Sequence, residues 1–113
     1  MYSLYKTDRK LKPFINTGAC GGYKKIPLGI KGVYVFYDFI TGEVLYVGKA
    51  KDLRKRLYSW TALGYGTAFE KWQKIAEKHY SVGLLAFKSE KNFLLEDYLI
   101  KTLNPPFNIR REL

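Results

Sequence analysis

A run of cationic side chains follows two tyrosine-bearing stretches of the chain and could bind phosphate groups. Tyr34 stands in the first stretch, and Tyr46 stands in the second. Five cations then oppose the single acid Asp52, namely Lys49, Lys51, Arg54, Lys55 and Arg56. Arginine forms paired hydrogen bonds with phosphate oxygens, and a tyrosine hydroxyl can hold or activate a water molecule. This combination predicts a site for a phosphate-bearing substrate.

One carboxylate falls on the apolar side of a predicted helix near the end of the chain. At about 100° per residue, Glu96 lies within an apolar arc, whereas its neighbour Asp97 lies on the polar side. The arc consists of Leu95, Leu99, Ile100 and Leu103. A carboxylate in such a place is costly unless it pairs with a cation or binds a metal ion. Two interpretations stay open, an ion pair of Glu96 with Arg56 or Lys49, and a functional site.

A hairpin must bring the two tyrosines together. The hydrophobic pattern predicts strands over residues 33–38 and 44–47, joined by a turn at residues 39–42, with Gly48 ending the second strand. Tyr34 and Tyr46 share a face of this hairpin if they lie opposite each other. A slip of one residue would place them on opposite faces.

A helix after Gly48 must position the cations. Asp52 is a good N-cap residue, and Leu53, Leu57 and Trp60 then form one apolar stripe. Arg56 lies at the border of this stripe, from where its guanidinium can reach a cleft. Arg54 and Lys55 point toward solvent on the same helix.

The remaining elements are predicted from caps and periodicity. A capping box at residues 67–70 begins a second helix, whose apolar side carries Phe69, Trp72, Ile75 and Ala76. Residues 80–87 are a third strand. Ser89 then caps a helix over residues 90–103, which ends before two prolines. The lone His79 has no evident partner and is interpreted as structural.

The composition indicates one small and strongly basic domain. Hydrophobic residues make up 47% of the 113 residues, which is enough for a core and excludes a disordered chain. The net charge of +10 favours a polyanion, and nucleic acid is the first expectation. No long apolar run or basic amphipathic helix supports a membrane partner.

Cys20 is the only cysteine, which excludes an internal disulfide and a cysteine zinc cluster. The N-terminus lacks a secretory signal, so we expect an intracellular protein.

Two groups of motifs resemble the GIY-YIG nuclease family, and most closely the N-terminal catalytic domain of excision-repair nucleases. The first group is Gly32-Val33-Tyr34, Tyr46-Val47-Gly48, Lys49-Ala50-Lys51-Asp52-Leu53 and Arg56-Leu57. The second is Leu94-Leu95-Glu96, Leu99-Ile100-Lys101, Pro105-Pro106 and Phe107-Asn108. The resemblance covers residues 31–109. We therefore expect an extension of unknown role at residues 1–30 and a GIY-YIG-like domain at residues 31–113.

The resemblance implies a fold and a set of site residues. The fold is α+β, with a three-stranded antiparallel sheet flanked by helices, and both tyrosine motifs border the site, which favours the register with Tyr34 opposite Tyr46. Glu96 matches the metal-binding carboxylate and Arg56 the catalytic arginine. Tyr34 and Tyr46 match the paired motif tyrosines, Lys49 matches a lysine next to the second motif, and Asn108 matches the asparagine after the final prolines. We expect these tyrosines and Lys49 to be catalytic as well, and Gly32 and Gly48 to be structural glycines. The cations Lys51, Arg54 and Lys55 are expected to bind nucleic acid together with Asn108. One departure is Trp60, which stands where excision-repair members often carry a tyrosine; Tyr58 lies two residues earlier.

The implied activity is hydrolysis of DNA phosphodiester bonds by water, with Glu96 holding one Mg²⁺ or Mn²⁺. Tyr46 is the expected general base and Tyr34 the positioning group, although the two roles could be exchanged. Because tyrosine has a pKa of about 10, this base needs nearby positive charge.

One site cuts one strand, so cleavage of both strands would need a homodimer or two events. Sequence specificity would come from residues 1–31 or from a partner chain, or it would be absent. Plain, branched or damaged duplexes, RNA, and roles in repair, mobile elements or defence all stay open. The alternative function is a non-catalytic nucleic-acid-binding module on the same fold.

Overall fold

The computed structural model describes residues 11–108, so the outer ends of the predicted extension and of the predicted domain lie outside the described residues. The elements in chain order are β1 (Ile15–Gly18), the one-turn helix η2 (Gly22–Lys25), β2 (Gly32–Asp38), β3 (Val44–Ala50), α1 (Leu53–Thr61), α2 (Thr67–Lys78), β4 (Val82–Lys88), α3 (Asn92–Leu103) and η3 (Pro106–Asn108). No helix within the described residues is long and apolar enough to cross a membrane.

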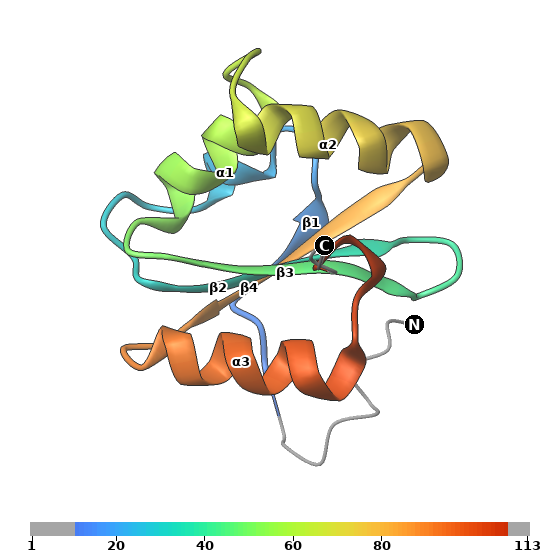
Figure 1. Ribbon diagram of the computed structural model, residues 1–113. Helices are drawn as coiled ribbons and strands as arrows, with labels where there is room; N and C mark the ends of the chain where they lie inside the picture. The colour runs from blue at the N-terminus through green and yellow to red at the C-terminus, as the bar shows by residue number, and fades with distance from the viewer. Residues whose placement is uncertain (1–10, 109–113) are drawn as a thin grey trace.

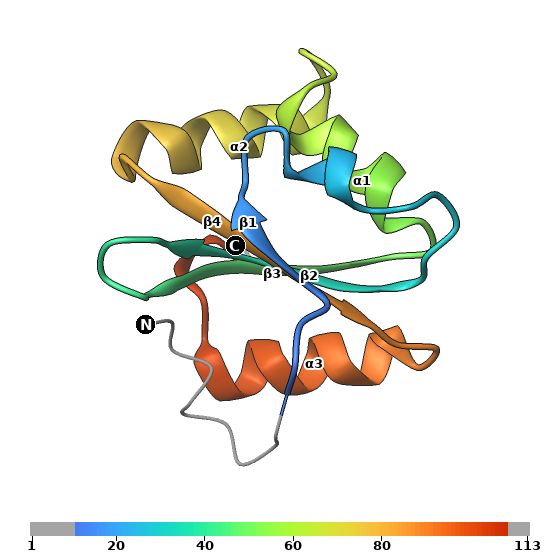
Figure 2. The same ribbon diagram turned by 180° about the vertical axis from the view of Figure 1, so that it is seen from behind.

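The sheet has four antiparallel strands in the order β1-β4-β2-β3, so the prediction of three strands was wrong. The additional strand β1 comes from the predicted extension and pairs with β4, with Ile15 opposite Ala86 and Gly18 opposite Gly83. Figure 2 shows β1 beside β4. Four residues are too few to produce a clear alternating pattern, and their partner strand is distant in the chain. Ala19 and Ile26 of the same segment are buried in the core.

Helices cover both faces of the sheet, with α1 and α2 on one face and α3 on the other (Figure 1). Along β2, alternate side chains enter two separate cores. Tyr34 and Phe36 pack in the core beneath α1 and α2. Val33 and Val35 pack in the core over α3, together with Leu95, Leu99 and their neighbours. Because β2 lies between β4 and β3, all seven of its residues are buried.

The pairing of β2 with β3 differs from the predicted register by two residues. Tyr34 lies opposite Gly48, and Phe36 lies opposite Tyr46. A shift of two keeps both tyrosines on one face, so their shared face is confirmed while the register was wrong. The strand also continues through Gly48 to Ala50. Gly48 is needed there because a Cβ atom would collide with the ring of Tyr34.

The helix α1 begins as predicted, because the Asp52 side chain accepts a hydrogen bond from the Lys55 amide at 3.2 Å. The other two caps were wrong. The N-cap of α2 is Gly66, without a side-chain bond, and Thr67 is the first helical residue. The N-cap of α3 is Lys91, two residues after the predicted Ser89. In α3 a polar side chain holds the helix start through tertiary contacts, so a local cap is not required.

That polar side chain is the buried Asn92, which is 5% exposed. Its amide donates to the carbonyl of Gly32 at 3.3 Å and to that of Ala50 at 3.1 Å. These carbonyls lie at adjacent ends of β2 and β3. Asn92 therefore anchors the start of α3 to the end of the sheet where the predicted site residues lie.

At the other end of β2, His79 has a hydrogen-bonding partner that the sequence did not reveal. The Nδ1 atom of His79 lies 2.8 Å from Oδ2 of Asp38. Asp38 also accepts hydrogen bonds from the amides of Ile40 and Thr41 in the hairpin turn. The bond from the Thr41 amide and the one from His79 hold the pKa of Asp38 below its ordinary value. The interpretation of His79 as structural agrees with this position.

The close contact between Gly48 and Tyr34 predicts a strong response to a single methyl group. We expect Gly48→Ala to lower the free energy of unfolding by about 1–3 kcal/mol, because the ring has to move within a packed core. Urea denaturation measures this change. Gly18→Ala is the control, since a Cβ atom there meets nothing within 4 Å, and it should stay within about 0.5 kcal/mol of wild type. Equal stability of the two variants would contradict the contact.

Candidate active site

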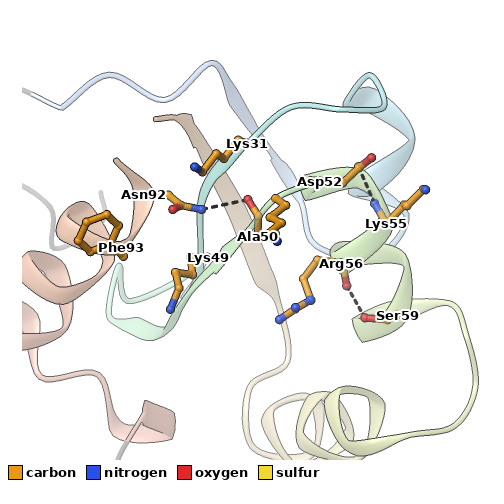
Figure 3. Close-up of a pocket in the computed structure, with 10 residues that line it drawn as sticks. Lys31, Lys49, Ala50, Asp52, Lys55, Arg56, Ser59, Asn92 and Phe93 are labelled. Atoms are coloured by element: carbon orange, nitrogen blue, oxygen red, sulfur yellow. Dashed lines mark hydrogen bonds between the residues drawn. The ribbon is translucent and has the colours of Figure 1, made fainter. Parts of the chain in front are cut away.

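A basic pocket opens beside β3, at the end of the strand that leads into α1. It has a volume of about 650 Å³ and an open mouth. Five cations and one acid line it, namely Lys31, Lys49, Lys51, Lys55, Arg56 and Asp52. Figure 3 shows Lys49 and Arg56 reaching into the pocket from β3 and from α1. The excess of positive charge suits a polyanion.

Tyr34 is buried behind this pocket, with 1% of its surface exposed. The indole Nε1–H of Trp60 donates a hydrogen bond of 2.8 Å to its hydroxyl oxygen. Burial and the neighbouring Tyr46 raise the pKa of Tyr34 well above its ordinary value, although the charge of Arg56 opposes part of the rise. Tyr34 therefore keeps its proton at neutral pH. A protonated hydroxyl can donate a hydrogen bond, but it cannot accept a proton as a base.

Tyr46 lies on the same face of the sheet but is only partly buried. Its ring centroid is 6.2 Å from that of Tyr34 and 4.7 Å from that of Trp60. The ammonium nitrogen of Lys71 on α2 lies 5.0 Å from the centroid of the Tyr46 ring. The two tyrosines therefore have unlike environments.

Trp60 belongs to the aromatic cluster in the core beneath α1 and α2. Its ring contacts Tyr34 at 6.1 Å and Phe36 at 5.1 Å between centroids. Tyr58, in contrast, is 42% exposed and packs against Tyr23 of η2. The indole supplies an N–H donor toward Tyr34, but it supplies no hydroxyl.

Glu96 approaches the edge strand β3 from the opposite layer. One of its carboxylate oxygens lies 3.3 Å from the ammonium nitrogen of Lys49, and its side chain is 20% exposed. Of the two ion pairs left open by the sequence, the structure has the pair with Lys49. The second oxygen, Oε2, has no hydrogen bond or ion pair with any described residue. That oxygen is available to a ligand.

The helical wheel predicted that Glu96 is more deeply buried than it is in the structure. The buried residues of α3 are Asn92, Leu95 and Leu99, whereas Phe93 and Leu94 are 56% and 51% exposed. Glu96 therefore lies at the edge of the buried face and reaches solvent. The prediction failed because it treated every apolar side chain on the helix as buried.

The donor set fits a magnesium or manganese ion that is bound mainly through water and substrate. Residues 11–108 contain no group of three or more His, Cys, Asp or Glu residues that could hold a metal ion. Glu96 contributes a single carboxylate with one available oxygen. Magnesium is commonly held by one or two carboxylates, with water and substrate phosphate completing its shell. A zinc site with four protein ligands is not formed by these residues.

The predicted nucleic-acid contacts separate into two groups. Lys51 and Lys55 line the pocket, whereas Arg54 is turned toward the N-terminal segment, where it donates to the carbonyl of Ile26 at 3.2 Å. The side chain of Asn108 accepts a hydrogen bond from the amide of Val47 at 2.8 Å and donates to the carbonyl of the same residue at 2.9 Å. The oxygen and the nitrogen of the Asn108 side-chain amide are therefore both hydrogen-bonded to the backbone of Val47.

Several residues of the site were not found by sequence reasoning. Lys31 and Phe93 line the pocket, and Lys71 covers Tyr46. Lys31 stands directly before the first glycine of the motif, which was a usable signal. Lys71 and Phe93 carry no such signal, because their roles depend on how separate helices pack against the sheet. Gly32, by contrast, was named, and a Cβ atom there would collide with the carbonyl oxygen of Phe87.

Known proteins resemble the chain over most of this region. The family model described as the UvrC-like GIY-YIG domain matches residues 30–109. The UvrABC system protein C of Flavobacterium psychrophilum is 42% identical over 79 residues, which are 69% of this chain and 13% of that protein. The protein of the same name from Hahella chejuensis is 43% identical over 79 residues, 69% of this chain and 12% of that protein. The chain thus spans a small part of the length of these relatives.

Solved structures of one domain are also similar, the GIY-YIG N-terminal endonuclease domain of UvrC from Thermotoga maritima. A point mutant with a tyrosine replaced by phenylalanine, bound to the catalytic divalent cation, is 32% identical with a TM-score of 0.57. The match covers 78% of this chain and 96% of that domain. The same domain bound to magnesium is 30% identical with a TM-score of 0.56, and the match covers 77% and 96%.

The buried hydroxyl of Tyr34 predicts a pH-dependent stability. Because burial raises the pKa of Tyr34, the folded protein keeps a proton that the unfolded chain releases near the ordinary value of 10.0. Its contribution is therefore fully present below pH 10 and is lost as the pH rises above that value. We expect Tyr34→Phe to cost about 1 kcal/mol at neutral pH, and the difference from wild type to shrink above pH 10.

Urea denaturation of both proteins on either side of pH 10 measures that difference. Tyr58→Phe is the matched control, because its ring is exposed, and it should change the stability by less than about 0.5 kcal/mol. A difference between wild type and Tyr34→Phe that stayed constant above pH 10 would contradict a neutral, buried hydroxyl.

Proposed function

Because the chain belongs to the UvrC-like GIY-YIG family, we propose that it is a divalent-metal-dependent endonuclease that hydrolyses phosphodiester bonds in DNA. The observation that carries this proposal is the arrangement around β3. Glu96 reaches the edge strand from one layer and Arg56 from the other, and a pocket with five lining cations lies beside them. The Thermotoga maritima domain with similar structure is an endonuclease domain with a bound divalent cation.

Glu96 would hold the cation through its available oxygen, while Lys49 keeps the other oxygen in place at 3.3 Å. A bound Mg²⁺ or Mn²⁺ supplies charge neutralisation at the scissile phosphate and at the leaving oxygen. Removing the carboxylate charge should therefore abolish the reaction and leave the fold intact. This position differs from Asp97, whose side chain is 60% exposed and pairs with Lys101 on the surface.

Arg56 would stabilise the negative charge that develops on the phosphate. It stands in the first turns of α1, where the Asp52 cap fixes the helix start and the Arg56 amide donates to the Asp52 carbonyl at 3.1 Å. Its guanidinium borders the pocket and also lies near the Tyr34 hydroxyl. A guanidinium at this place can stabilise the negative charge of the transition state.

Tyr46 is our choice for the general base, and Tyr34 for the group that positions the attacking water. Tyr34 is too deeply buried to lose its proton at neutral pH, because its pKa is raised by that burial. Tyr46 is closer to solvent and lies under the positive charge of Lys71. The phenolate of Tyr46 would take the proton of the water as the water oxygen attacks phosphorus and the leaving oxygen departs.

The substrate contacts offered by the pocket are charge contacts. Lys51 and Lys55 can neutralise backbone phosphates, which gives binding that weakens with salt and does not read sequence. One such site cuts one strand, so cleavage of both strands would require a homodimer, a partner chain or two successive events. DNA repair is the role suggested by the relatives, which are named as components of the UvrABC system.

A plasmid-nicking assay tests the proposal. Purified protein is incubated with supercoiled plasmid in the presence of Mg²⁺, Mn²⁺ or a chelator. We expect nicking with either metal and none with the chelator. Glu96→Gln and Arg56→Ala should each reduce the rate by about 10²–10³-fold or more.

Asp97→Asn is the matched control for Glu96→Gln, because it removes the adjacent carboxylate of the same helix. It should nick at the wild-type rate. Metal-independent DNA binding by wild type, with no nicking of plasmid or of branched and damaged duplexes and no effect of Glu96→Gln on that binding, would instead support the non-catalytic binding module.

The position of Lys71 predicts how the nicking rate responds to its loss. Lys71→Gln removes the positive charge that lies 5.0 Å from the centroid of the Tyr46 ring, so it should lower the nicking rate at neutral pH by about two- to five-fold. Lys71→Arg keeps the charge and should retain the wild-type rate. Lys74→Gln removes an exposed lysine of the same helix and serves as the control. An unchanged rate in Lys71→Gln would exclude this role for Lys71.

A further inference from the structure

We propose that the basic pocket beside Glu96 binds an unpaired nucleotide of the DNA strand, with its phosphate against the lysines and its base against the ring of Phe93. This inference rests on the proposed function and names the substrate class of the same site, namely DNA that is not fully paired next to the scissile bond.

Phe93 is the first observation. It lies in the first turn of α3, lines the pocket and is 56% exposed (Figure 3). An aromatic ring on a charged surface offers a face for stacking, and stacking on an aromatic side chain is open to every base. The neighbouring Leu94 is similarly exposed, at 51%, but it does not line the pocket.

The charge and size of the pocket are the second observation. Lys31, Lys51 and Lys55 surround the same space as Phe93, and Asp52 is the one acid of its lining. The Asp52 side chain already accepts hydrogen bonds from the amides of Gly29 and Lys55. A volume of about 650 Å³ lies within the range of sites for small organic ligands, and a nucleotide is of that size.

Continuity with the proposed active site is the third observation. Lys49 contacts Glu96 at 3.3 Å and also lines the pocket, and Arg56 lines it from α1. A strand whose phosphate lies between these groups would therefore have its neighbouring nucleotide in the pocket.

The pocket favours an unpaired nucleotide because of where the aromatic ring lies. In a duplex both faces of a base are covered by its neighbours, so Phe93 could stack only on a base that has left the helix. Opening a paired base costs free energy, whereas a base in a loop, gap or fork is already open. The start of α3, which carries the Phe93 ring, is also fixed in place, because the adjacent Asn92 anchors it to the carbonyls of Gly32 and Ala50. The ring can therefore distinguish an unpaired base from a paired one.

DNA binding in the presence of a chelator tests the inference without cleavage. The anisotropy of a labelled, fully paired duplex is compared with that of the same duplex carrying a short unpaired loop. We expect wild type to bind the looped DNA more tightly. Phe93→Ala should weaken binding of the looped DNA by about ten-fold and leave the paired duplex unchanged. Phe93→Trp keeps a stacking face and should retain the preference.

Leu94→Ala is the matched control and should behave as wild type. An equal loss by Phe93→Ala on both DNAs, or the same loss by Leu94→Ala, would overturn the inference. Thermal denaturation checks that the variants are folded.

The same two DNAs with Mg²⁺ separate the two proposals. Nicking of both at equal rates and equal binding would leave the endonuclease standing and remove the unpaired-nucleotide pocket. Selective binding that depends on Phe93, without nicking of either DNA, would leave the pocket standing and remove the endonuclease.

Discussion

The contact between the Tyr34 ring and the backbone of Gly48 is the constraint on which the site depends. Only a residue without a side chain can lie beneath this ring, so the contact fixes which residues of β2 and β3 face each other. With Gly48 opposite Tyr34, strand alternation places Tyr46 on the face covered by α1 and α2 and Lys49 on the face covered by α3. The edge strand thus carries reactive groups to both layers, and a slip of one residue would exchange them.

Different degrees of burial give the side chains of Tyr34 and Tyr46 different chemical properties. The ring centroids of Tyr34 and Tyr46 lie 6.2 Å apart. Tyr34 is buried and hydrogen-bonded to Trp60, whereas Tyr46 is only partly buried and lies beside Lys71. Burial raises the pKa of Tyr34 and keeps its hydroxyl neutral, whereas Tyr46 is only partly buried. Trp60 contributes to this asymmetry, because its N–H can donate to Tyr34 but cannot accept the proton of a neighbouring hydroxyl.

Local signals in the sequence predicted the parts of the fold that are locally determined. The start of α1 followed from Asp52, and its buried face from Leu53, Leu57 and Trp60, which are 0%, 1% and 2% exposed. The strand β1 was missed because four residues gain their structure only from pairing with β4. The exposure of Phe93 was likewise unpredictable, since an apolar residue in a helix is assigned to the core unless its neighbours are known. The pairing of Glu96 with Lys49 was one of two options, and only the packing of α3 decided between them.

The double hydrogen bond between Asn108 and Val47 has a consequence for the behaviour of the molecule in solution. β3 is an edge strand, and the outward N–H and C=O of such a strand form a template on which another chain can add a strand. The Asn108 amide occupies both groups of Val47 in the way a neighbouring strand would. The turn that carries Asn108 therefore covers the outward hydrogen-bonding groups of Val47, and it protects this point of the edge strand from pairing with another chain.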